Sequence, residues 1–131
     1  MSLSHTIVWL DHQDAKIIDF SFDDKHVLRV HHEDGDRKLH HKVNTIGSGK
    51  VAEDPNYYRD IVAAMDNAHE VLITGPGNAK LALKKHIDKH QPSLAKRVVG
   101  VETLDHPSDG ELLAYARRYF KAVDQMAGDT D

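Results

Sequence analysis

The stretch that decides the fold is HEVLITGPGNAKLALKKHI, residues 69–87. Residues 71–74 are short and apolar, which is typical of a strand that is buried in a sheet. Gly75-Pro76-Gly77-Asn78 follows and predicts a tight turn. The pattern after this turn predicts a helix that runs to about His90. A buried strand that leads directly into a helix is typical of an α/β domain.

Upstream of this stretch, three segments predict an antiparallel meander. Apolar and β-branched residues predict strands over residues 5–10, 15–22 and 26–32, and the links between them are short and polar. Residues 33–54 are polar and contain glycine, which predicts a long exposed loop. Asp54-Pro55 then predicts the start of a helix, because aspartate is a favoured N-cap and proline suits the first helical position.

Downstream, residues 97–103 predict a fifth strand. Ser108 and Glu111 have the spacing of a capping box, so a final helix is expected to begin near Asp109 and to end at Gly128. We therefore predict an α/β fold with a mixed five-stranded sheet covered by helices. In this sheet an antiparallel meander is followed by β-α-β-α-β-α order.

Length and composition limit the class of protein. The chain has 131 residues, which predicts a single domain over residues 1–131, with an ordered core over 4–126 and a tail over 127–131. Its net charge is −4, so any contact with nucleic acid would need a local basic patch. It has no cysteine, which excludes disulfides, thiolate metal sites and a cysteine nucleophile. No apolar run approaches the roughly 20 residues that cross a bilayer, so we expect a cytoplasmic protein without membrane contact.

The long loop is the first candidate site. It includes HHKVNTIGSGK, residues 40–50, which concentrates positive charge on an acidic chain. It is not a Walker A loop, because Val51 follows Gly49-Lys50 and Asn44 stands where the first glycine belongs. The loop can instead meet the phosphates of a nucleic acid, or it can be a solvated, flexible segment. The candidate contacts are Lys38, His40, His41, Lys42, Gly47, Gly49 and Lys50.

The glycine turn is the second candidate, as an anion site formed by Gly75, Gly77, Asn78 and Lys80. Free amides at the start of a helix favour an anion, and Lys80 would add a positive charge. The pattern is not G-x-G-x-x-G, because Lys80 occupies the last position. We favour the other interpretation, in which glycine and proline serve only the geometry of a βα turn.

Metal binding is the third candidate. His86 and His90 are four positions apart on a predicted helix, and a third ligand would have to come from Asp105 or His106. A second possible set, for Mg²⁺ and phosphodiester chemistry, is Asp11, Glu102 and Asp105. We favour ordinary turn polarity and partly buried or helix-capping histidines, so no cofactor is expected.

Three segments resemble the middle domain of archaeal and eukaryotic class I peptide chain release factors. IVWLDHQDAKIIDF, residues 7–20, resembles its opening hairpin, and residues 69–87 resemble its helix, strand, glycine turn and second helix. RVVGVETLDHPSDGELLAYA, residues 97–116, resembles its last strand and final helix. The resemblance spans residues 5–120 and is greatest to small bacterial stand-alone proteins of this type, which are assigned to the translational machinery. It implies the middle-domain fold and a function at the ribosome or on RNA.

The resemblance also gives the long loop an expected role. In the release factors the corresponding loop carries Gly-Gly-Gln, enters the peptidyl transferase centre and promotes peptidyl-tRNA hydrolysis. Residues 33–54 contain Gly47-Ser48-Gly49-Lys50 but no glutamine. The resemblance therefore implies contact with RNA, whereas the missing glutamine argues against peptidyl-tRNA hydrolysis.

The sequence thus predicts a translation-associated protein that contacts the ribosome or RNA through a basic loop, and it favours a role without catalysis. Two alternatives remain open. One is a metal-dependent hydrolase or nuclease that uses Asp11 and Asp105, or His86 and His90. The other is a non-catalytic interaction module that self-associates as a homo-oligomer.

Overall fold

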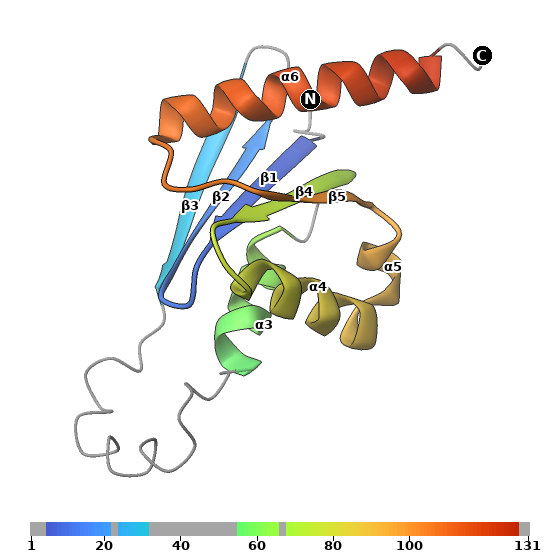
Figure 1. Ribbon diagram of the computed structural model, residues 1–131. Helices are drawn as coiled ribbons and strands as arrows, with labels where there is room; N and C mark the ends of the chain where they lie inside the picture. Colours follow the sequence, from blue (N-terminus) through green and yellow to red (C-terminus); the bar gives the residue numbers. More distant parts are fainter. Residues whose placement is uncertain (1–4, 22–23, 32–54, 66–67, 129–131) are drawn as a thin grey trace, which may run out of the picture.

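The computed structural model describes residues 5–21, 24–31, 55–65 and 68–128, which form one mixed five-stranded sheet with helices on both faces (Figure 1). This confirms the predicted α/β fold class. The elements in chain order are β1 (His5–Leu10), β2 (Asp14–Phe20), β3 (Lys25–His31), α3 (Pro55–Ala64), β4 (Glu70–Gly75), α4 (Ala79–His90), α5 (Pro92–Ala95), β5 (Val98–Thr103) and α6 (Asp109–Gly128).

The strands lie in the order β3-β2-β1-β4-β5. β1 pairs with β2 and β2 pairs with β3 in antiparallel fashion, which is the predicted meander. β4 is parallel to both β1 and β5. The two predicted strands at 71–74 and 97–103 are therefore neighbours in a single sheet, as the β-α-β pattern requires.

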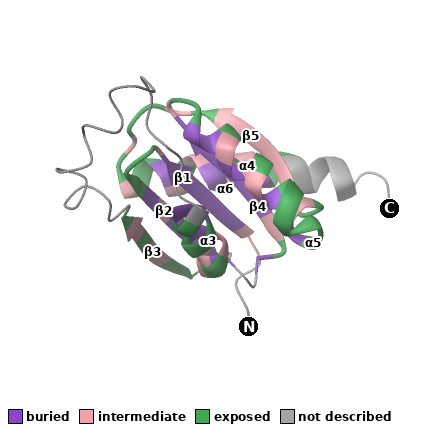
Figure 2. Ribbon diagram, turned by 90° about the horizontal axis from the view of Figure 1, so that it is seen from below, coloured by how far each residue is buried: buried purple, intermediate pink, exposed green. Residues whose placement is uncertain are grey.

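Side chains of β1 alternate between two cores, because successive residues of a strand point to opposite faces. Val8 and Leu10 belong to the core under α3 and α4, whereas Ile7 and Trp9 belong to the core under α6. Figure 1 shows α6 across one face of the sheet and α3, α4 and α5 on the other. Figure 2 shows that burial is greatest in the central strands β1 and β4 and least in the edge strand β3.

The two ends of the sheet matter for the sites. β1, β3, β4 and β5 all run in one direction, so they finish together at what we call the carboxyl end of the sheet. Their first residues lie at the opposite, amino end. α4 follows β4 and therefore runs from the carboxyl end back toward the amino end, where α5 and then the start of β5 lie.

Some predicted bounds need correction. β2 spans Asp14–Phe20 and not 15–22, because the amide of Ser21 donates to the carbonyl of Asp24 at 2.9 Å and turns the chain there. β3 correspondingly begins at Lys25 and ends at His31. The short helix α5, Pro92–Ala95, was not predicted, because four residues give no helical periodicity. α6 ends at Gly128, as predicted.

The start of α6 is as predicted. The amide of Glu111 donates to Ser108 Oγ at 3.1 Å, and the amide of Ser108 donates to Glu111 Oε1 at 2.9 Å. This reciprocal pair is a capping box, which satisfies two amides that the helix itself cannot.

Within the described residues, no helix combines the length and the apolar character needed to cross a membrane.

Candidate functional site

The first candidate, residues 33–54, lies outside the described residues, and so do Lys38, His40, His41, Lys42, Gly47, Gly49 and Lys50. The structure does place the elements on either side of it. β3 ends at His31, which pairs with Asp14 at the start of β2. The hydroxyl of Tyr57, in the first turn of α3, donates to the carbonyl of Asp11 at 2.9 Å. The chain therefore leaves β3 and enters α3 at the same carboxyl end of the sheet.

Asp11 and its neighbours close the hairpin between β1 and β2. Asp11 Oδ1 accepts from the amides of Gln13 and Asp14, both at 2.8 Å, and the Asp11 amide donates to the Asp14 carbonyl at 3.0 Å. This is an Asx-type turn, in which a short carboxylate replaces backbone acceptors. Burial and the nearby carboxylate of Asp11 raise the pKa of Tyr57, so its hydroxyl stays protonated as a donor. Asp11 thus acts as a turn residue that also positions α3.

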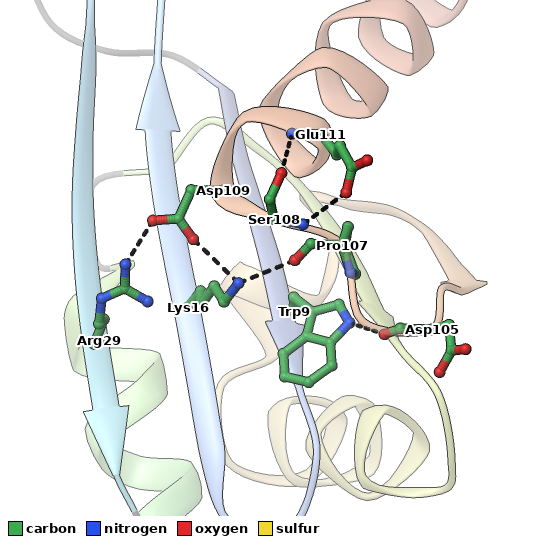
Figure 3. Close-up of polar contacts among 8 residues, drawn as sticks. All are labelled: Trp9, Lys16, Arg29, Asp105, Pro107, Ser108, Asp109 and Glu111. Carbon is green, nitrogen blue, oxygen red and sulfur yellow. Dashed lines mark hydrogen bonds and ion pairs between the residues drawn. The ribbon is translucent and has the colours of Figure 1, made fainter.

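A clasp of four side chains, Trp9, Lys16, Arg29 and Asp109, joins the meander to the segment before α6 (Figure 3). Trp9 Nε1 donates to the carbonyl of Asp105 at 2.7 Å and lies 3.3 Å from that of Leu104. Lys16 Nζ donates to the carbonyl of Pro107 and to Asp109 Oδ1, both at 3.1 Å. Arg29 Nη2 pairs with Asp109 Oδ2 at 2.5 Å.

Trp9, Lys16 and Arg29 of the clasp line a cleft of about 310 Å³ at the carboxyl end, together with Asp11, Asp14 and His106. The hydrogen bond from Lys16, followed by the charges of Lys16 and Arg29, lowers the pKa of Asp109, although partial burial acts in the opposite direction. One carboxylate therefore neutralises two cations that would otherwise face the cleft. The described part of the cleft is consequently not a strong anion site.

The glycine turn has a structural role. A Cβ atom on Gly75 would overlap the carbonyl oxygen of Leu10, so only glycine fits where β4 passes the end of β1. Lys80 is 8% exposed, and its ammonium group donates to the carbonyl of Gly77 at 2.5 Å. The Lys80 side chain therefore makes its hydrogen bond within the turn and does not extend outward from it. The geometry supports the favoured interpretation of Gly75, Gly77, Asn78 and Lys80 as a βα turn.

The metal candidates do not come together. His86 and His90 have ring centroids 4.7 Å apart on α4, which runs from the carboxyl end back toward the amino end. Asp105 and His106 follow β5 at the carboxyl end, where the ring of His106 lies 5.1 Å from that of Trp9. Among the described residues, which include Asp11 and Glu102, no three histidine, aspartate or glutamate side chains form a metal-binding group.

The clasp was not found by sequence reasoning. Asp109 was singled out only as the start of a helix, and Arg29 only as part of a strand. Arg29 and Asp109 are 80 positions apart, so their pairing depends on the order of strands in the sheet. The capping box at Ser108 is the one local signal that marks this place in the chain.

The fold defined above also occurs in translation factors. Pelota from Archaeoglobus fulgidus matches with a TM-score of 0.65 and 12% identity over 96% of this chain and 33% of that one. Pelota from Thermoplasma acidophilum matches with a TM-score of 0.61 and 19% identity over 87% of this chain and 32% of that one. The archaeal translation termination factor aRF1 gives a TM-score of 0.53 and 16% identity over 96% of this chain and 39% of that one.

These similarities confirm the expected resemblance to release-factor-like proteins at the level of the fold. The chain spans only about a third of the length of the two Pelota structures. No protein-family model and no curated protein sequence matches it. The fold is therefore shared with one part of these factors, and what the chain does is a separate question.

Proposed function

We propose that this protein acts in translation and contacts the ribosome or RNA through the basic side chains of residues 33–54. The observation that carries the proposal is the fold, which it shares with Pelota and with an archaeal translation termination factor. The position of the segment supports it further. Residues 33–54 lie between β3 and α3, where the resemblance to release factors places the loop that enters the ribosome.

The proposed contact does not include peptidyl-tRNA hydrolysis. The release-factor loop depends on a glutamine, and residues 33–54 contain none. Within the segment, residues 37–50 contain no carboxylate and carry positive charge, with Lys38, Lys42 and Lys50 as the ammonium groups and His40 and His41 as titratable partners. Such groups bind phosphates of any sequence by releasing counterions. The proposed function is therefore binding that is independent of base sequence.

The test replaces Lys38, Lys42 and Lys50 together with alanine and measures affinity for single-stranded RNA and for ribosomes. We expect weaker binding and a slope of log affinity against log salt that is smaller by up to about 2, since each single-strand phosphate contact contributes roughly 0.7. A matched control removes three exposed cations elsewhere, Lys25, Arg118 and Lys121. Equal affinity and slope in wild type and the loop variant would refute the proposal, as would an equal loss in the control.

Protonation of the two histidines provides a second measurement. Histidine gains charge as pH falls through its ordinary range, so binding should strengthen between about pH 8 and pH 6. The replacement of His40 and His41 with alanine should remove the part of this dependence that belongs to the segment. A pH dependence that is unchanged in that variant would assign the effect to histidines elsewhere in the chain.

A further inference from the structure

A second cleft lies at the amino end of the sheet, between α3 and the α5 region. Its volume is about 440 Å³, and it is lined by Arg59, Val62, Ala63, Gln91, Ser93, Leu94 and Arg97. α3 brings one arginine to the cleft, and the link between α5 and β5 brings the other. Figure 2 shows α3 and α5 on the same face of the sheet.

The two arginines of this cleft donate hydrogen bonds to neutral acceptors. Arg97 Nη1 donates to the carbonyl of Ala68 at 3.0 Å, and Arg59 Nη1 donates to Asn56 Oδ1 at 2.9 Å. Both acceptors are neutral, and within the described residues no carboxylate forms an ion pair with either guanidinium. This differs from Lys16 and Arg29 in the clasp, which share the carboxylate of Asp109.

Neutral donors complete the lining. The side chains of Gln91 and Ser93 are exposed and make no hydrogen bond to any described residue. Each guanidinium carries five N–H donors, of which the structure uses one, so most of the hydrogen-bonding capacity of the cleft is donor capacity. Burial, then His90 and then Arg59 lower the pKa of His86, so the Arg59 guanidinium lies near enough to act on that ring.

We propose that this cleft between α3 and α5 binds a phosphate group, held by Arg59 and Arg97 with Gln91 and Ser93 as additional donors. Paired guanidinium groups suit phosphate, because their planar N–H groups match its oxygens in two-point contacts. The phosphate comes from an RNA backbone or from a small phosphorylated molecule. The site does not depend on the proposed role of residues 33–54, since its side chains all come from other segments of the chain.

The test uses the full chain labelled with ¹⁵N and titrated first with inorganic phosphate and then with a short oligouridylate. In wild type, phosphate should shift the amide resonances of residues 91–97. Arg59→Gln with Arg97→Gln should weaken phosphate binding by about tenfold or more, because charge-assisted hydrogen bonds from two groups are lost. Lys25→Gln with Lys121→Gln removes the same charge from exposed sites elsewhere and should leave the affinity unchanged.

A second variant controls for loss of the fold, because Arg97 also donates a hydrogen bond to the carbonyl of Ala68. Arg59→Gln with Ser93→Ala leaves that bond in place and should still weaken phosphate binding. The inference is wrong if phosphate shifts no resonance of residues 91–97, or if the arginine variants bind as well as the lysine control. If the arginine variants also lose binding of oligouridylate, the phosphate group belongs to RNA. If they lose binding of inorganic phosphate only, the ligand is a small phosphorylated molecule. A loss of RNA binding in the Lys38, Lys42 and Lys50 variant alone would support residues 33–54 and leave this result unaffected.

Discussion

Gly75, the last residue of β4, lies against the end of the parallel strand β1. The carbonyl oxygen of Leu10 occupies the space that a Cβ atom would need. Replacing Gly75 with alanine should therefore destabilise the protein by about 3 kcal/mol, the upper range for overpacked sites. Urea unfolding followed by circular dichroism measures the change.

Gly77, two positions further along, is the matched control for Gly75. A Cβ atom there would meet nothing within 4 Å, so Gly77→Ala should change stability by no more than about 0.5 kcal/mol. Similar losses in both variants would mean that the turn as a whole, and not the contact with Leu10, requires glycine.

Asp109 is the residue on which the clasp depends, and its contribution should vary with pH. Asp109→Asn should cost about 1 kcal/mol at pH 7, a modest value because the side chain is 40% exposed and solvent screens its ion pairs. Lys16 and Arg29 lower its pKa in the folded state, so the unfolded chain takes up the proton first as pH falls. The stabilisation is therefore complete above about pH 4 and is lost as pH falls through the lower, folded pKa.

The measurement is the free energy of unfolding of wild type and Asp109→Asn from pH 7 down to pH 3. The difference between the two proteins should shrink at the acid end. A difference that stays constant over this range would show that the carboxylate charge does not matter and that the asparagine simply packs poorly.

At the scale of elements, β5 and α6 pack closely where Gly100 has no side chain. A Cβ atom on Gly100 would overlap the hydroxyl of Tyr119 and lie 3.5 Å from Leu72 Cδ1. Burial and the nearby Glu102 raise the pKa of Tyr119, as expected for a phenol held against the strand. Gly100→Ala should cost about 1–3 kcal/mol, because the tyrosine ring must move.

A double-mutant cycle tests that contact. Tyr119→Phe removes the hydroxyl, so it should recover part of the loss when it is combined with Gly100→Ala. Gly110→Ala is the control, since open space surrounds that glycine. Strictly additive effects of the two substitutions would show that Gly100 is required by the strand and not by the helix.

Elements differed in how well the sequence predicted them. The strand at 71–74 and the capping box at Ser108 were found because local chemistry determines both of them. α5 was missed because a single turn of helix has no periodic pattern, although Pro92 stands at its first position. The end of β2 was placed too late because residues 21 and 22 continue the alternation, whereas a backbone bond from Ser21 turns the chain.

At the scale of the whole molecule, topology was predictable and the sites were less so. A meander followed by strand-helix alternation allows few arrangements of a single sheet, and the observed one is among them. The two clefts need side chains from distant segments. Arg59 and Arg97 line one cleft only because α3 and α5 lie on the same face, and α5 was itself unexpected. The histidine pair on α4 could be predicted as a pair, but the absence of a third ligand beside it among the described residues could not.

The interactions that hold the end of β3 and the start of α3 determine how much the sequence between them can change. The register of Asp14 with His31 holds the end of the strand, and the bond from Tyr57 to Asp11 holds the start of the helix. Neither fastening uses a residue of the intervening segment 32–54. The closure entropy of a flexible connection rises by only about 0.6 kcal/mol for each doubling of its length. Insertions, deletions and wholesale exchange of that segment therefore cost the scaffold little, and selection can alter what it recognises while the sheet beneath it stays the same.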